Sequence, residues 1–263
     1  MVRFRIVSRA RLTWLATALL VSSSTVGGAQ QGGSALWALT QRCVLGATLR
    51  GDPSPCVEAR PSVTDQPGYV VLKDRTGVAQ FLLMPADRIT GMEDPAILAP
   101  SSTNYWAEAW RARRWMAARL GRPVPREAVS LAVNSRFGRT QNQLHIHIDC
   151  VRRDVARLLR EHPGEPDGRW HAVPGGIDGK AYRILWLSSE HLVGWNPFRL
   201  LADGMNVEPS RMGWHTLVVV AARLRDGSPG FAVLEDEAGR TLLDPASGEV
   251  LQDHACGILE AER

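Results

Sequence analysis

The sequence lacks several features that would assign it to a familiar class. It contains no long low-complexity tract and no repeat of fixed period, which argues against a solenoid. It also has no C-x-x-C pair and no Cys/His spacing typical of a zinc site. With 263 residues, of which 44% are hydrophobic, the chain can bury a sizeable core, and we expect a single globular unit.

Acidic residues are missing from the amino-terminal segment. The first 29 residues contain four arginines and no acid, so the formal net charge of +4 comes from this segment. Subtracting 4 from the 31 basic residues leaves 27, which equals the 27 acidic residues. The rest of the chain is therefore neutral. Because it has no Lys/Arg run interleaved with aromatic residues, we expect no nucleic-acid partner.

The same segment is typical of an export signal. A basic start is followed by "LTWLATALLV" and "SSSTVGGAQ", with Gly27 and Ala29 placed as a cleavage site requires. The uncharged stretch from Leu12 to Gln41 is also long enough to span a bilayer. We therefore expect residues 1–29 to be a signal peptide or a membrane anchor, and residues 30–263 to fold outside the cytoplasm.

Four cysteines agree with an oxidising compartment. They allow three pairings into two disulfides. We favour Cys43–Cys56, which flank the turn-rich "GDPSP", and Cys150–Cys256, which would tie the carboxyl-terminal tail to a central strand. Buried free thiols are the alternative.

The periodicity of apolar residues predicts an α+β fold. The pattern of strand hairpin, helix and strand hairpin occurs twice, in a first half of about 60–160 and a companion half of about 165–263. Only the first half carries the histidine motif. The expected strands cover 68–74, 80–85, 128–134, 143–150, 181–187, 214–225 and 231–237, and the expected helices cover 104–120, 151–161 and 197–205.

The motif with the clearest chemistry is "QLHIHIDC", residues 143–150. Side chains on a strand alternate between faces, so His145, His147 and Asp149 would point toward a cleft or solvent, while their apolar neighbours enter the core. Polar residues on a solvated strand face are the simplest alternative. Donors for a negatively charged ligand come from the preceding residues Asn134, Arg136, Arg139, Gln141 and Asn142.

Two chemistries fit this cluster. The spacing H-x-H-x-D is similar to the start of the metallo-β-lactamase ligand set, although Cys150 stands where that set has a further histidine. The other histidines, at positions 162, 171, 191, 215 and 254, show no recognisable ligand spacing. Alternatively, a neutral imidazole can attack phosphorus and form a covalent intermediate, with amides and arginines binding the charged oxygens.

A resemblance to known families favours the second chemistry. "QNQLHIHID" resembles the signature of the histidine-triad superfamily of nucleotide hydrolases and transferases. The blocks "GYVVLKD", "FLLMP", "AVSLAVNSRFGRTQNQLHIHIDC", "PSPC" and "QDHACGIL" are similar to the bacterial CDP-diacylglycerol pyrophosphatase family over about residues 43–259. The resemblance implies a histidine-triad-like antiparallel sheet with packed helices.

The resemblance also implies a reaction, in which CDP-diacylglycerol and water give CMP and phosphatidate without a metal or other cofactor. His147 would be the nucleophile, and His145 would order the site. Asn134 and Gln141 would bind phosphate or ribose oxygens. Arg136, Arg139 and Asn142 join them as candidate substrate-binding residues on charge and position, with a solvated loop as the alternative for the arginines. The expected location is the periplasmic side of the bacterial inner membrane, or the periplasm after cleavage of the leader.

Asp149 departs from the superfamily pattern, which usually has histidine at the third position of the triad. An ionised aspartate offers no donor to a leaving phosphate. It could instead orient His147, accept a proton from the attacking water, or be a solvated carboxylate at a strand end.

The sequence gives a weaker indication of where the lipid half of such a substrate would bind. Trp106, Trp110 and Trp115 lie on one expected helix, either as core residues or as an acyl-chain groove or interfacial anchor. Three functions stay open: a histidine-nucleophile pyrophosphatase at a membrane surface, a metal-dependent phosphoesterase, and an exported ligand-binding module. The sequence leaves the oligomeric state undecided.

Overall fold

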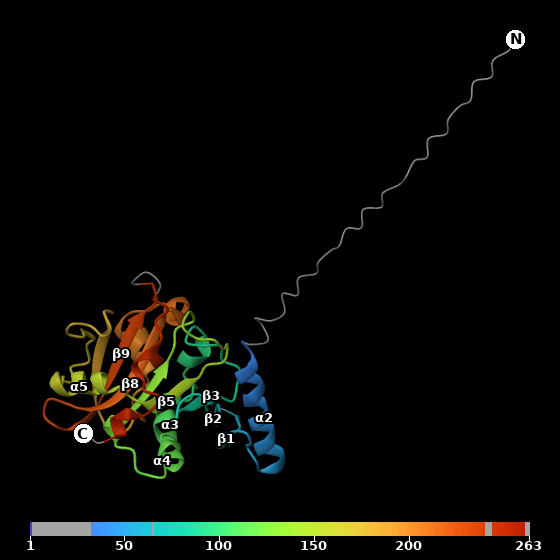
Figure 1. Cartoon of the computed structure of the whole chain (residues 1–263), viewed down its shortest axis with the longest axis horizontal. Coiled ribbons are helices and arrows are strands. Elements are labelled where there is room, and N and C mark those ends of the chain that lie inside the picture. Colours follow the sequence, from blue (N-terminus) through green and yellow to red (C-terminus); the bar gives the residue numbers. More distant parts are fainter. Residues whose placement is uncertain (2–32, 65, 240–243, 261–263) are drawn as a thin grey trace.

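The computed structural model describes residue 1 and residues 33–64, 66–239 and 244–260 (Figure 1). The expected leader, residues 1–29, lies almost wholly outside this part. The α-helices are α2 (Ala35–Arg50), α3 (Tyr105–Ala112), α4 (Arg114–Leu120), α5 (Arg153–Glu161) and α6 (Pro197–Gly204). Short 3-10 helices are η1 (Pro95–Leu98), η2 (Arg126–Ala128), η3 (Pro209–Trp214), η4 (Gly248–Leu251) and η5 (Gly257–Leu259).

The strands form one antiparallel sheet of nine, in the order β1-β2-β3-β5-β4-β8-β9-β7-β6. The α+β prediction is therefore confirmed. β4 and β8 are neighbours in the middle of the sheet. On one side β4 is followed by β5, β3 and β2, and on the other side β8 is followed by β9, β7 and β6. The strands are β1 (Glu58–Arg60), β2 (Tyr69–Lys73), β3 (Phe81–Pro85), β4 (Val129–Val133), β5 (Ile146–Cys150), β6 (His171–Ala172), β7 (Arg183–Ser188), β8 (His215–Arg223) and β9 (Pro229–Glu237).

The two faces of the sheet bury different sets of side chains because strand residues alternate. On one face, Ile146 and Ile148 of β5 pack with Trp106 and Trp110 of α3 and Phe198 of α6 in the largest apolar cluster. The two tryptophans are 0% and 2% exposed. The core interpretation of Trp106 and Trp110 is thus confirmed. An acyl-chain groove there is wrong, because they lie on the face opposite to the histidines.

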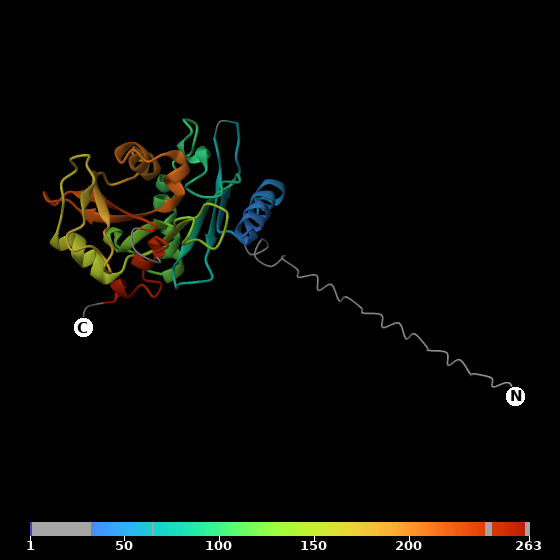
Figure 2. The same ribbon diagram turned by 90° about the horizontal axis from the view of Figure 1, so that it is seen from above.

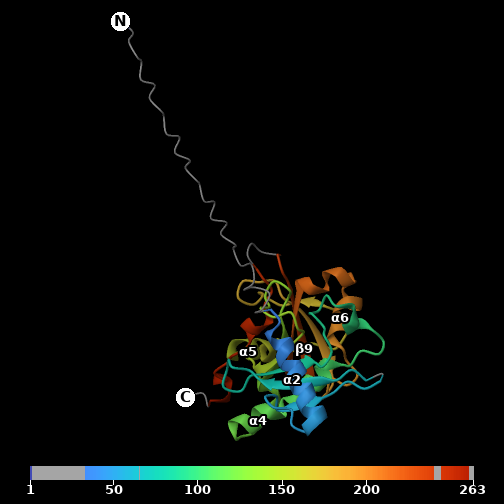
Figure 3. The ribbon, with the colours of Figure 1, turned by 90° about the vertical axis from the view of Figure 1, so that its right-hand side faces the viewer.

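The other face is covered in two places. α5 packs on the companion half, where Val155 and Leu159 contact apolar residues of β7, β8 and β9. At the opposite edge, α2 lies over β2 and β3, and Leu36 packs near Val70 and Met84. Figure 2 shows β1 to β3 between α2 and the green helices, and Figure 3 shows α2 across these strands. A space between the two coverings is left over β5.

Most predicted elements are present, with three differences. The strand expected over 143–150 begins only at Ile146, so His145 lies just before β5. The helix expected over 104–120 divides at Arg113 into α3 and α4, and it ends at Gly121, whose φ of 65° is left-handed and suits glycine. The helix α2 was not predicted. Part of it, up to Gln41, lies in the stretch considered as a bilayer span. Within the residues that the structure describes, no helix has both the length and the apolar character needed to cross a membrane.

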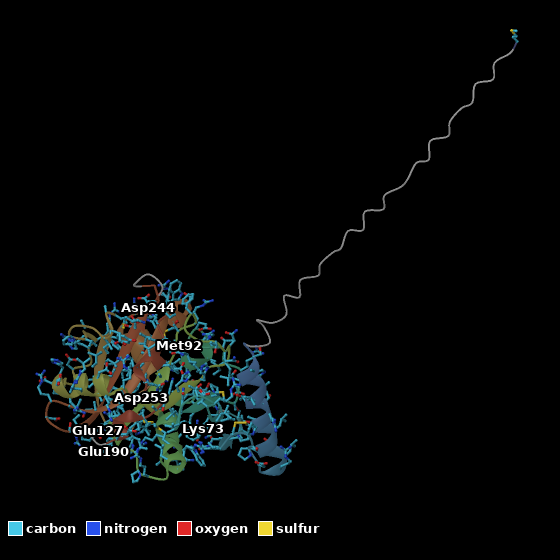
Figure 4. All side chains as sticks on the ribbon, viewed as in Figure 1. Lys73, Met92, Glu127, Glu190, Asp244 and Asp253 are labelled. Carbon is cyan, nitrogen blue, oxygen red and sulfur yellow. A yellow bond between two sulfur atoms is a disulfide. The ribbon has the colours of Figure 1, made fainter. Side chains whose placement is uncertain are left out.

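Two disulfides join Cys43 to Cys56 and Cys150 to Cys256, which are the pairings favoured from the sequence. The first ties α2 to the segment before β1, and the second ties the carboxyl-terminal segment to β5 (Figure 4). Such bonds are typical of proteins that fold outside the cytoplasm.

The lengths of the two disulfide loops predict different contributions to stability. The sequence separations are 13 and 106 residues. On the loop-entropy model, removing the shorter cross-link costs about 3 kcal/mol and the longer one about 4.7 kcal/mol. We expect guanidinium unfolding to show a larger loss for the Cys150→Ala/Cys256→Ala variant than for the Cys43→Ala/Cys56→Ala variant. The reverse order would contradict this account.

Candidate active site

A cavity of about 630 Å³ lies on the histidine-bearing face, between α2 and the carboxyl-terminal segment. Its floor follows a register row of the sheet, in which His147 pairs with Leu82 on one side and Ala132 on the other. Figure 4 labels Lys73, which lines this cavity, next to α2. The full lining is Ala35, Leu36, Leu39, Pro55, Leu72, Lys73, Asp74, Arg75, Thr76, Leu82, Asn134, Gly138, Thr140, Gln141, His145, His147 and Glu249.

His147 is held at the floor by its Nδ1 atom, which lies 3.1 Å from Glu249 Oε1 and 2.8 Å from Gln80 Nε2. Gln80 Nε2 donates both to His147 Nδ1 and, at 3.2 Å, to Glu249 Oε1, so Nδ1 accepts in this arrangement. The tautomer with the proton on Nδ1, for which Glu249 is the acceptor, requires the Gln80 amide to turn. In that tautomer Nε2 carries the lone pair. Nε2 is fully buried and has no hydrogen-bond partner in the described part of the chain.

Burial also decides the charge of His147. Desolvation, with smaller effects of His145 and His254, lowers the pKa of His147 well below 6.5. The ring is therefore neutral near pH 7, as a nucleophile requires. The expectation of an open cleft is wrong in one respect, since this residue is only 4% exposed.

Glu249 is positioned by Asn134 and by a close approach of backbone to sheet. Asn134 Nδ2 donates to Glu249 Oε2 at 2.7 Å, while Asn134 Oδ1 accepts from the Gly248 backbone N–H at 2.8 Å. A Cβ at Gly248 would lie 2.8 Å from Thr216 Oγ1 and from Val218 Cγ2. Only glycine at this position therefore allows η4 to pack so closely against the sheet beside His147. Asn134 lies in the cavity, as expected, but its side chain is committed to Glu249.

His145 reaches the same cavity with a fixed tautomer. Its Nδ1 donates to the Gln143 carbonyl at 2.6 Å, so the neutral ring carries its lone pair on Nε2. Burial lowers the pKa of His145, although the Gln143 carbonyl opposes this. The ring lies edge-on to His147 with centroids 4.8 Å apart. Two neutral imidazoles thus lie side by side.

Asp149 does not line the cavity. It is fully buried, and its Oδ2 accepts a hydrogen bond from His254 Nδ1 at 2.7 Å, while Oδ1 accepts from the Cys150 backbone N–H at 2.8 Å. The solvated-carboxylate interpretation is therefore wrong. Burial raises the pKa of Asp149 to about 6, against the lowering effect of His254.

The loop before the motif reaches the cavity only in part. Gln141 lines it and accepts a hydrogen bond from the Leu36 backbone N–H at 3.2 Å, at the start of α2. Arg139 binds Glu93 through both terminal nitrogens, at 2.8 and 2.5 Å, and also lies near Asn142 Oδ1. Arg136 is exposed. Asn142, Arg136 and Arg139 lie outside the cavity lining.

Sequence reasoning missed four residues of the site. Gln80 and Glu249 contact His147. Lys73, at the end of β2, and Arg75, on the following turn, line the cavity, and Lys73 Nζ donates to the Asp74 and Gly77 carbonyls. The nearest signal was the resemblance of "QDHACGIL", which begins just after η4. Nothing in spacing alone joins these residues to the motif.

The donors of the H-x-H-x-D pattern do not converge on one point. Among the described residues, one group of three His, Cys, Asp or Glu side chains brings its ligand atoms together: Asp149, Cys150 and Cys256. Both cysteines are in a disulfide and offer no thiolate. The residues present therefore do not fit the metal site considered from the sequence.

The fold and the cavity define an α+β protein with paired neutral histidines in a partly apolar pocket. Comparison with known proteins identifies the family to which the chain belongs. A family model described as CDP-diacylglycerol pyrophosphatase matches residues 31–260. A protein of Yersinia pestis named CDP-diacylglycerol pyrophosphatase is 40% identical over 226 residues, which cover 86% of this chain and 84% of that protein. The chain belongs to the CDP-diacylglycerol pyrophosphatase family.

The raised pKa of Asp149 predicts a pH-dependent stability. A group that holds its proton more tightly when folded stabilises the fold below its unfolded pKa, and this contribution is lost as the pH rises through the folded value. For Asp149 the window runs from 3.8 to about 6. Unfolding free energies of wild type and Asp149→Asn should therefore diverge across it, with wild type losing about 3 kcal/mol relative to the variant. A difference that is independent of pH would contradict this prediction.

Proposed function

We propose that the chain hydrolyses CDP-diacylglycerol to CMP and phosphatidate through a covalent nucleotidyl-histidine intermediate on His147. The observation that carries the proposal is the pair of neutral imidazoles at the cavity floor, one of them with Nδ1 facing a carboxylate. The family membership supplies the substrate.

The first step is an in-line displacement at the phosphorus that carries cytidine. The lone pair on His147 Nε2 forms an N–P bond, the bond from that phosphorus to the bridging oxygen breaks, and phosphatidate leaves with the electron pair. Because Nε2 is buried, the ring must turn toward the cavity when substrate binds. Glu249, whose Oε1 lies 3.1 Å from Nδ1 in the resting site, accepts a hydrogen bond from the Nδ1–H and stabilises the positive charge that develops on the ring.

The second step releases the nucleotide. Water attacks the same phosphorus, the N–P bond breaks, CMP leaves and one proton is released. His145 Nε2 carries a lone pair and can accept that proton. Lys73 and Arg75 are candidates to bind the phosphate oxygens, and Gln141 is a candidate for the ribose or a phosphate. Arg136, Arg139 and Asn142 stay candidates from the sequence alone.

One observation favours His145 as a second candidate nucleophile. Its Nδ1 is anchored on a backbone carbonyl, and its Nε2 is not among the fully buried unpaired atoms. It therefore needs less movement than His147 to reach a substrate. The overall reaction would be unchanged.

We further propose that the two halves of the sheet are related and histidine-triad-like. Strands β2 and β3, helix α3, and strands β4 and β5 follow one another in the first half, and β6, β7, α6, β8 and β9 repeat that order in the second. The companion half would fill the place of a second subunit. We propose a periplasmic location at the membrane surface, for which the leader and the two disulfides are the support.

Trapping the intermediate tests the nucleophile. Protein is mixed with CDP-diacylglycerol labelled at the cytidine-bearing phosphorus and quenched in base, where phosphoramidates survive. We expect an acid-labile label that fragmentation of the labelled peptide places on His147 and not on His145, and its loss, with turnover reduced by more than about 10³-fold, in His147→Asn. A label on His145 would move the nucleophile, whereas full turnover without label, or activity lost to chelator, would refute the covalent mechanism.

Glu249 provides a second test because its proposed role is indirect. Glu249→Gln keeps the size of the side chain but weakens its hold on the Nδ1 proton, so we expect kcat to fall by about 10²-fold with little change in KM. Glu260→Gln makes the same change at an exposed position of the same carboxyl-terminal segment and should be silent. Equal kinetics in both variants would remove Glu249 from the mechanism.

A further inference from the structure

The cavity has two chemically different sides. Polar groups surround the histidines, among them Asn134, Gln141 and Glu249. The side toward α2 is apolar and consists of Leu36, Leu39, Pro55, Leu72 and Leu82. We call these five residues the leucine wall.

The leucine wall is built jointly by the sheet and by α2. In the sheet, Leu72 pairs with Leu82, and Leu82 pairs with His147, so the three side chains share one row and one face. Neighbouring strands are about 4.8 Å apart, which puts Leu82 directly beside the histidine and Leu72 one strand farther away. α2 then contributes Leu36 and Leu39 from above. The Cys43–Cys56 bond fixes this helix to the sheet edge.

Two residues of the wall, Leu39 and Leu82, lie outside the apolar clusters of the described residues. Leu36 and Leu72 pack against the small cluster around Cys43 and Cys56. Leu39 and Leu82 belong to none of the three apolar clusters of the described residues, although Leu82 is 4% exposed and Leu39 is partly buried. Apolar side chains that line a cavity offer their cavity-facing surface to an apolar ligand, and Leu39 offers more of it than Leu82, which is almost fully covered.

We propose that the leucine wall binds the first methylenes of the substrate's two acyl chains while the phosphoanhydride lies at His147. This inference rests on the proposed function and adds the position of the lipid half. The assignment is supported by the position of the leucine wall, which lines the same cavity as the histidines. In CDP-diacylglycerol the second phosphate, the glycerol and the ester groups separate the attacked phosphorus from the first acyl methylenes. The row His147–Leu82–Leu72 likewise leads from the histidine to apolar side chains farther along the sheet.

α2 also has apolar residues on its outer face, where Leu45 and Leu49 are 55% and 73% exposed. These side chains point away from the cavity and would contact a bilayer rather than a bound chain. They therefore offer a control on the same helix. An acyl site inside the cavity and a membrane contact on the outside predict different behaviour toward substrates that are not in a bilayer.

The test uses two short-chain substrates, diacetyl and dibutanoyl CDP-diacylglycerol, both kept monomeric. Each fully buried methylene contributes up to about fourfold in binding. For the full-length wild-type protein we expect kcat/KM to rise about tenfold from the shorter to the longer substrate. We expect Leu39→Asp to reduce this rise to less than about threefold, and Leu49→Asp to leave it intact.

Two further readouts separate the possible failures. Competitive inhibition by CMP reports on the nucleotide end and should be the same in wild type, Leu39→Asp and Leu49→Asp. An unchanged chain-length effect in Leu39→Asp, or an equal loss in Leu49→Asp, would overturn the acyl site while leaving the reaction intact. A wild-type protein that releases no CMP would instead refute the proposed function.

Photochemical labelling covers the case in which Leu39→Asp does not fold. The wild-type protein is irradiated with dihexanoyl phosphatidate carrying a diazirine near the carboxyl end of one chain. We expect cross-links in the peptides that contain Leu36, Leu39 or Leu72. Cross-links confined to α3, or to the outer residues Leu45 and Leu49, would overturn the proposal without any test of turnover.

Discussion

The alternation of side chains along β5 is the constraint on which the other parts of the structure depend. Its even-numbered residues, Ile146 and Ile148, enter the large core that α3 and α6 cover. The odd-numbered residues therefore face the opposite side of the sheet, where α2 and α5 leave a space. A shift of one residue in register would exchange these faces and put both imidazoles into the apolar core. Stability and the placement of the histidines are thus set by the same strand.

The cavity is completed by the carboxyl-terminal segment, which folds back over β4 and β5. Gly248 approaches the sheet closely enough for Glu249 to reach His147, and Asn134 holds the carboxylate from the sheet side. Farther along, His254 pairs with the buried Asp149. His147 and Asp149, the two polar residues of β5, therefore both have a partner in this one segment. Because these contacts involve buried charge and amide groups, their geometry is costly to change.

Features of the fold and the site that depend on residues close together in the sequence could be predicted, whereas features that depend on distant residues could not. Strand periodicity predicted the hairpins and the common face of His145 and His147 correctly, because alternation is local. α2 was missed since its buried positions, Thr40, Cys43 and Gly46, show no apolar repeat. Glu249 could not be paired with His147 because only the folded chain brings η4 to β5.

The same limit explains the arginines of the loop. A positive charge beside a catalytic motif suggests a ligand, but Arg139 is engaged by Glu93, which comes from a distant part of the chain. The basic residues that line the cavity are instead Lys73, at the end of β2, and Arg75, on the turn that follows, and the sequence analysis singled out neither. The sequence therefore indicated that basic residues would lie near the histidines, but which basic residues line the cavity depended on tertiary packing.

The Cys150–Cys256 bond has a consequence for when the protein becomes competent. It anchors the end of the segment that carries Glu249 and His254, and it joins that end to the strand that carries the histidines. In a reducing environment this anchor is missing, and the arrangement of the cavity depends on weaker contacts alone. Oxidation of this pair therefore fixes the carboxyl-terminal segment across β5, so that the surroundings of His147 depend on the redox conditions in which the chain folds.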